Sequence, residues 1–154
     1  MGEIGKNFRL RGGQIVKVDD SGRIKIPEEF REIIENNYGK ELYITSIDGK
    51  NILIYPLPIW EEIEEKIIKL SSVHPLVTRY RNRTSYFGNT VQIDSKGRIL
   101  VPPRLREKAQ INGEVIILGN INYLEVWNKE IFERKLELEP LTEEDLKTLA
   151  ELGI

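Results

Sequence analysis

Hydrophobic and polar residues alternate along two short segments near the start of the chain. Val16 and Val18 are each followed by a polar residue, and Ile24 and Ile26 repeat the alternation a few residues later. A period of two is typical of half-buried β-strands. Residues 19–22 between them combine an Asp, whose carboxylate can accept backbone N–H groups, with a Gly, which tolerates positive φ. The pattern predicts a β-hairpin in this region.

The same pattern recurs at an offset of 75 residues. Residues 13–32 and 88–107 align without gaps, and 9 of the 20 aligned positions are identical. Two copies at so long a period are too few for a solenoid and indicate a duplicated half-fold with pseudo-twofold symmetry. The residues predicted to stabilise the two turns are Asp19, Gly22, Asp94 and Gly97.

Each copy continues with a short helix, a second pair of strands and a closing helix. A Pro ends each first strand pair, and apolar residues then recur with helical spacing. The predicted helices are residues 28–34, 58–70, 104–109 and 129–138, and the second hairpins join 42–45 to 52–55 and 115–118 to 124–127. We interpret Trp60 and Trp127 as core or helix–sheet packing residues rather than as nucleobase-stacking residues.

Two further segments carry local signals. Residues 71–75 form a break, and residues 76–84 carry three Arg at alternate positions, which fits either a basic helix or an extended arm. Near the end, Thr142 and Asp145 form a capping-box pattern that predicts a short terminal helix.

Composition narrows the class of protein. The 154 residues are 40% hydrophobic and 31% charged, which is typical of a globular protein with a core. No apolar run approaches the roughly 20 residues that span a bilayer. The chain has no Cys and a single His, which excludes disulfides and thiolate metal sites and disfavours a catalytic triad. We expect a cytoplasmic, non-enzymatic protein with no metal, cofactor, membrane or small-molecule partner, and His74 as a surface or capping residue.

Charge is segregated along the chain. The 23 basic and 25 acidic residues give a net charge of −2, which by itself argues against a nucleic-acid partner. However, residues 66–108 hold ten Lys and Arg against two acids, whereas residues 125–154 hold nine acids against four bases. Charge alone leaves two interpretations open, a binding face with solubilising ends or two differently solvated surfaces.

The side chains that face away from the apolar side of the first strand pairs are mostly cationic. They include Lys17, Arg23 and Lys25 in the first copy and Arg98 in the second. No second carboxylate, His or phosphate-binding loop recurs beside them, so no catalytic constellation is present. Two interpretations remain: an Asp-capped turn with a local Asp–Arg ion pair, or an Arg presented for bidentate contact with phosphate or guanine.

These motifs resemble a known family. Residues 16–27, with residues 30–31, are similar to the signature of AbrB-type swapped-hairpin DNA-binding domains. Two such motifs, with residues 53–60 and 70–72 between them, resemble the MraZ family of transcriptional regulators associated with the bacterial division and cell-wall gene cluster. The resemblance extends over residues 8–138.

The resemblance implies both a fold and a function. The implied fold is α+β, mainly β: a pseudo-twofold swapped-hairpin (double-split) β-barrel with short flanking helices. Residues 8–75 and 76–138 are then two AbrB-like repeats that form one barrel, and residues 139–154 are an acidic C-terminal tail. The implied activity is binding of short direct promoter repeats in double-stranded DNA by a nucleoid-associated homo-oligomer, a ring.

The resemblance also implies site residues. The implied DNA-binding residues are cations that match basic positions of these families or stand beside such positions in the strands and turns. They are Arg11, Lys17, Arg23, Lys25, Arg31, Lys96, Arg98 and Arg106. Three positions depart from the pattern. Leu10 replaces the Phe of an N-terminal Phe-Arg-Gly, Val16 stands at a basic AbrB position, and Gln92 stands where Lys17 does in the first copy. The share of DNA contact carried by each copy therefore stays open.

An alternative function is an antitoxin-like or assembly module that uses the same barrel to bind a protein partner. Such a module would need a C-terminal segment able to wrap a toxin, and the segment after Leu138 is short for that purpose. The exposed faces of helices 58–70 and 129–138 are the expected subunit contacts in either case.

Overall fold

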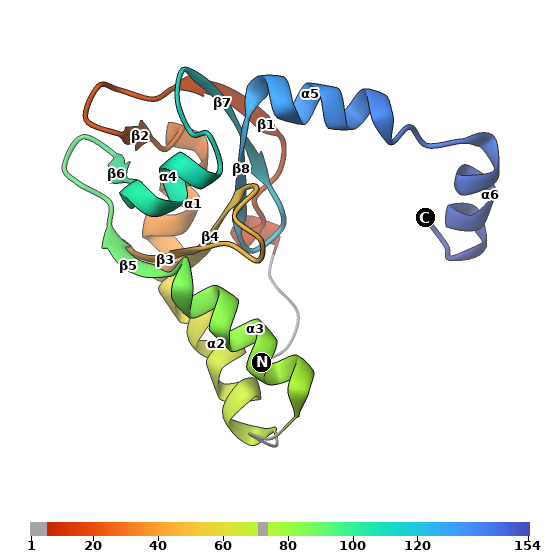
Figure 1. Cartoon of the computed structure of the whole chain (residues 1–154), viewed down its shortest axis with the longest axis horizontal. Helices are drawn as coiled ribbons and strands as arrows, with labels where there is room; N and C mark the ends of the chain where they lie inside the picture. The colour runs from red at the N-terminus through yellow and green to blue at the C-terminus, as the bar shows by residue number, and fades with distance from the viewer. Residues whose placement is uncertain (1–5, 71–73) are drawn as a thin grey trace.

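The two sequence copies fold into equivalent sets of elements in a computed structural model, which describes residues 6–70 and 74–154 and is α+β with mainly antiparallel strands (Figure 1). The first set is η1 Lys6–Phe8, β1 Gly13–Lys17, β2 Arg23–Lys25, α1 Glu28–Tyr38, β3 Glu41–Thr45, β4 Ile52–Pro56 and α2 Leu57–Lys69. The second set is α3 Pro75–Tyr86, β5 Asn89–Gln92, β6 Arg98–Leu100, α4 Pro103–Lys108, β7 Glu114–Gly119, β8 Leu124–Asn128, α5 Lys129–Leu138 and α6 Glu143–Glu151.

The first two strands of each copy pair with strands of the other copy. β1 pairs with β7, β5 with β3, and β2 with β6. The prediction that residues 16–18 and 24–26 form a hairpin with each other is therefore wrong. The chain does reverse at Asp19, whose N–H donates to the Arg23 carbonyl at 3.0 Å. Before the turn, β1 pairs with β7 over five residues, which is more than the three-residue β2 could pair with.

The sheets are not closed into a barrel. The large sheet has the strand order β1-β7-β8-β4-β3-β5, so β1 and β5 are its edges, and β2 with β6 forms a separate two-stranded sheet. The α+β class and the exchange of strands between copies are present, but a closed AbrB-type barrel is not confirmed. The second hairpins, β3 with β4 and β7 with β8, pair as predicted.

A single apolar core joins the two sheets. Ile24 of β2 and Ile99 of β6 are 0% and 1% exposed and belong to the same cluster as Phe30 of α1 and Leu105 of α4. Because neighbouring residues of a strand point to opposite faces, burial of these isoleucines turns the adjacent polar side chains outward. The core therefore determines which residues the two-stranded sheet presents to solvent.

Helices α2 and α3 form a pair that extends from the sheet (Figure 1). Trp60 of α2 is 4% exposed and stacks on Tyr43 of β3 with ring centroids 4.6 Å apart, which confirms a packing role. The arginine-rich segment is a helix, α3, and His74 caps it by accepting the Leu76 N–H at 3.2 Å. Residues 71–73 of the predicted break lie outside the described part of the chain.

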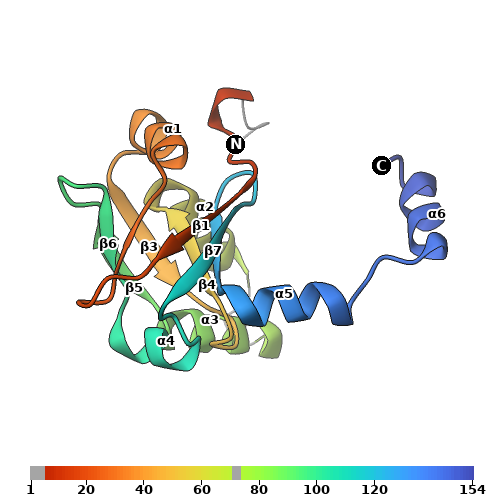
Figure 2. The same ribbon diagram turned by 90° about the horizontal axis from the view of Figure 1, so that it is seen from above.

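The C-terminal helices form an arm. Figures 1 and 2 show α5 running away from the sheets and α6 at its far end. Trp127, at the base of the arm, is 9% exposed and lies against Phe132 with centroids 5.7 Å apart, again in a packing role. Both bonds of the predicted Thr142–Asp145 capping box are present, at 2.9 and 3.1 Å. None of the helices formed by the described residues has the length and apolar character needed to cross a membrane.

Candidate nucleic-acid interface

Strands β2 and β6 form a two-stranded ribbon with a largely cationic outer face. Ile24 lies opposite Ile99 and both face the core, so the flanking residues face outward. The outward cross-strand pairs are Arg23 with Leu100 and Lys25 with Arg98. Three of the predicted DNA-binding residues therefore share one surface, with Lys25 exposed and the two arginines half-buried.

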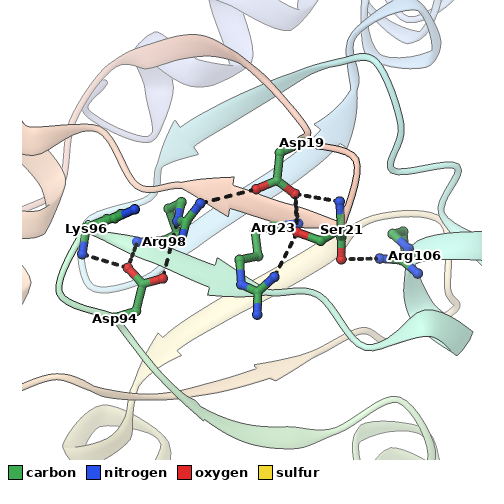
Figure 3. A network of polar contacts seen from close by, with 7 residues as sticks. All are labelled: Asp19, Ser21, Arg23, Asp94, Lys96, Arg98 and Arg106. Carbon is green, nitrogen blue, oxygen red and sulfur yellow. Dashed lines mark hydrogen bonds and ion pairs between the residues drawn. The ribbon is translucent and has the colours of Figure 1, made fainter.

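The turn that precedes β2, residues 19–23, is closed by its Asp (Figure 3). One carboxylate oxygen of Asp19 accepts the N–H groups of Ser21 and Arg23, both at 2.9 Å, and the Ser21 hydroxyl at 2.8 Å. Gly22 supplies a φ of +81°. The bond from the Arg23 N–H is the largest of several effects that hold the pKa of Asp19 below its usual range. We call this segment turn one.

The turn that precedes β6, residues 94–98, repeats this geometry. Asp94 accepts the N–H groups of Lys96 and Arg98, both at 2.8 Å, and Gly97 has a φ of +79°. The bond from the Arg98 N–H is the largest cause of the lowered pKa of Asp94. We call this segment turn two. The two turns thus have the same backbone conformation and the same ionised carboxylate at their base.

The two turns differ in what holds the arginine side chain. Arg98 donates to Asp94 at 3.3 Å and also lies 3.6 Å from a carboxylate oxygen of Asp19. Arg23 instead donates to the Ser21 hydroxyl at 2.7 Å, and no carboxylate of the described residues forms an ion pair with it. The local ion-pair interpretation therefore describes Arg98, whereas the charge of Arg23 is not neutralised.

A second pair of arginines, one on α1 and one on α4, packs against the two turns. Arg106 of α4 donates to the Ser21 carbonyl at 3.2 Å and covers Gly22, where a side-chain Cβ would collide with its guanidinium group. Arg31 of α1 covers Gly97 in the same way. Each helix thus packs on the turn of the other copy. The family resemblance indicates these arginines only as DNA contacts, and the one sequence signal for the packing role is their recurrence eight residues after each Gly-Arg pair.

The remaining predicted cations occupy different places. Lys17 is exposed at the end of β1 near turn one, opposite Glu114 of β7, and Lys96 is exposed in turn two. Arg11 is exposed at the other end of β1, so the structure does not bring it to the ribbon.

The chemistry available at the ribbon is recognition of anions. Arg guanidinium groups bind phosphate or guanine through two parallel hydrogen bonds, whereas Lys acts as a point charge. Among the described residues there is no group of three or more His, Cys, Asp or Glu that could hold a metal ion. The ribbon supplies donors and charge on a rigid support.

Comparison with known proteins finds similarity over most of the chain. The family model described as "MraZ protein, putative antitoxin-like" matches residues 10–82 and 88–151. A protein named Transcriptional regulator MraZ from Acidobacterium capsulatum is 42% identical over 145 residues, which cover 94% of this chain and 99% of that protein. Proteins of the same name from Koribacter versatilis and Escherichia coli K12 are 40% and 34% identical, covering 94% and 90% of this chain and 99% and 91% of their own lengths.

Proposed function

Because this chain belongs to the MraZ family, we propose that it is a DNA-binding transcriptional regulator. Its relatives are named Transcriptional regulator MraZ, and the observation that supports DNA binding most directly is the β2–β6 ribbon with Arg23, Lys25 and Arg98 on its outer face. The major groove of B-DNA, about 12 Å wide, admits a two-stranded β-ribbon. The ribbon would enter the groove with these cations toward bases and phosphates.

The predicted cations would have different roles according to where they lie in the structure. Arg23 and Arg98 are the candidates for base or phosphate contact, because each lies on the ribbon beside a rigid turn. Lys17 and Lys96, exposed beside the two turns, would contact phosphates. The half-buried Arg31 and Arg106 would hold the turns in position.

The proposed targets are short direct repeats in a promoter of the division and cell-wall gene cluster, bound by a homo-oligomeric ring at the nucleoid in the cytoplasm. One chain carries few cations on its ribbon, so it can neutralise only a few phosphates. Several linked subunits on adjacent repeats gain affinity without any new type of contact. A protein with a net charge of −2 can then bind DNA through one basic face of each subunit.

The arm supports the oligomeric part of the proposal. Its large apolar side chains are more than half exposed at the following positions: Leu136, Leu138, Leu141, Leu146, Leu152 and Ile154. Such a concentration of exposed apolar groups marks a surface for protein association.

An electrophoretic shift with a promoter fragment carrying short direct repeats tests the function. At moderate salt, the protein should shift this fragment at concentrations that leave a scrambled fragment of equal composition free. Equal shifts for the two fragments would overturn sequence-specific regulation.

The second candidate function is an antitoxin-like or assembly module. It is favoured by the description of the matching family and by the arm that extends from the sheets. Copurification of a stoichiometric protein partner, combined with no preference for promoter DNA, would support this function over the first.

A further inference from the structure

A groove beside α4 contains a group of cations away from the ribbon. Its volume is about 800 Å3, and it lies between the end of α3, the β3–β4 loop and α4. Arg83 of α3 and Arg104 and Lys108 of α4 line it, together with the carboxylates of Asp48 and Glu107. Three positive charges face two negative ones, so the groove is basic overall.

The two arginines of the groove are held by uncharged groups. Arg83 donates to the Ile47 carbonyl at 3.1 Å, and Arg104 donates to the Tyr86 carbonyl at 3.3 Å. The guanidinium carbon of Arg104 also lies 4.5 Å from the centre of the Tyr86 ring. None of the ion pairs in the described part of the chain involves Arg83, Arg104 or Lys108. The guanidinium groups of Arg83 and Arg104 are therefore held in place by uncharged partners and are available to bind an external anion.

The corresponding helix of the first copy has the opposite charge. At an offset of 75 residues, Arg104 corresponds to Glu29 and Lys108 to Ile33. Helix α1 carries four Glu and one Arg, whereas α4 carries two Arg, one Lys and one Glu. Figure 2 shows α1 and α4 on opposite sides of the ribbon. DNA seated on the ribbon would therefore meet an attractive helix on one side and a repulsive helix on the other.

Helix α4 connects the groove rigidly to turn one. The same short helix that carries Arg104 and Lys108 also carries Arg106, which donates to the Ser21 carbonyl. Turn two has the acidic α1 in the equivalent place, through Arg31 and Gly97. The difference in charge is thus fixed relative to the two ends of the ribbon.

We propose that the groove beside α4 binds backbone phosphates of the DNA that flanks the ribbon's site, on one side only, and so sets the direction in which the chain lies on DNA. This inference rests on the proposed DNA-binding function. The backbone of the ribbon is nearly symmetric about the Ile24–Ile99 pair, with Arg23 matching Arg98 although Leu100 stands in place of Lys25, so this backbone would fit a groove in two opposite orientations. Attraction at α4 and repulsion at α1 favour one of them.

The test uses the full chain and three duplexes: one promoter repeat alone, and the same repeat extended by about one helical turn, roughly 10 base pairs, at one end or at the other. Binding is measured by fluorescence anisotropy across a salt series. The wild type should gain several-fold in affinity from one extension and little from the other. Arg104→Ala/Lys108→Ala should lose that gain, and its log–log salt slope on the extended duplex should fall by about 2.

Matched variants distinguish the loss of the groove's cations from a general loss of positive charge and from poor folding. Arg79→Ala/Arg81→Ala removes the same charge from exposed positions of α3 that do not line the groove and should keep the one-sided gain. Lys108→Ala alone breaks no hydrogen bond of the described residues and should lose part of the gain even if the double variant is poorly folded.

Each other outcome overturns the inference in a distinguishable way. Equal gains from the two extensions, or a one-sided gain that survives in the double variant, would refute the groove's role while leaving DNA binding intact. No binding to any duplex would refute the proposed function together with the inference. Inorganic pyrophosphate raising the melting temperature of the wild type but not of the double variant, without a one-sided DNA effect, would instead indicate a small phosphorylated ligand.

Discussion

Turn one and turn two have the same backbone but hold their arginines differently. In both, an Asp accepts two backbone N–H groups and a Gly takes a positive φ. The residue before the Gly differs: Ser21 accepts a hydrogen bond from Arg23, whereas Lys96 has only donors and Arg98 turns to two carboxylates. The Asp and Gly that both turns share thus determine the backbone conformation of the turn. The residue before the Gly, which differs between the turns, determines whether the arginine that follows is ion-paired.

The largest expected effect of this difference is on DNA affinity. Arg23→Ala should weaken binding to a promoter fragment by about tenfold or more, within the range of one good bidentate contact. Arg98→Ala should weaken it less, because Asp94 and Asp19 already offset its charge. Fluorescence anisotropy at moderate salt measures both, and thermal melts should show stability changes within about 1 kcal/mol. Equal losses of affinity would show that the ion pairs do not restrain Arg98.

The glycines of the turns should have the next largest effect. Gly22→Ala and Gly97→Ala place a Cβ both at positive φ and against a guanidinium group, of Arg106 and Arg31 respectively. We expect each to cost about 1–3 kcal/mol of unfolding free energy. Gly113→Ala is the control, since it has a φ of +62° but open space around its Cβ. Denaturant unfolding should show a smaller loss for the control; an equal loss would remove the packing role of the arginines.

Local structure could be predicted from the sequence much better than strand pairing. The alternation around Val16 and Ile24 places both strands correctly, and the Asp19–Gly22 chemistry predicts the chain reversal. Neither feature specifies a partner, because backbone hydrogen bonds along a strand edge are the same for any neighbour. The exchange of strands between copies therefore depends on which registers the whole core allows.

For the candidate site too, the sequence predicts individual residues but not which of them lie together. The repeat identifies Arg23 and Arg98, and charge counting identifies a basic middle segment. The pairing of Arg98 with Asp19 crosses from one copy to the other, so it cannot be read from either copy alone. The groove likewise brings together Arg83 and Arg104 from two helices that the strands β5 and β6 separate in sequence.

The carboxylates at the base of the two turns should make stability depend on acidic pH. Asp19 and Asp94 have folded-state pKa values below the ordinary 3.8, so their contribution is present above that pH and is lost as pH falls through the folded values. Asp19→Asn/Asp94→Asn should melt at a temperature that varies less with pH in this window. Melting curves from pH 7 to pH 2 test this, and parallel curves for variant and wild type would contradict it.

The smallest expected effect comes from removing one charge while keeping the turn. In Asp19→Asn the amide oxygen can still accept the N–H groups of Ser21 and Arg23, and one of the carboxylates beside Arg98 becomes neutral. DNA affinity should rise by about twofold, the size of a screened charge interaction near the surface. Anisotropy titrations at low salt measure it. A loss of affinity in the folded variant would show that Asp19 orients Arg98 for DNA rather than offsetting its charge.

In our proposal, the ribbon between the two turns is the DNA-reading surface. The most direct measurement is binding of the wild type and of Arg23→Ala/Arg98→Ala to promoter repeats and to scrambled DNA across a salt series. We predict that the wild type prefers the repeats and that the folded double variant loses this preference, with a log–log salt slope shallower by about 2. A folded double variant that keeps both the preference and the slope would contradict the claim.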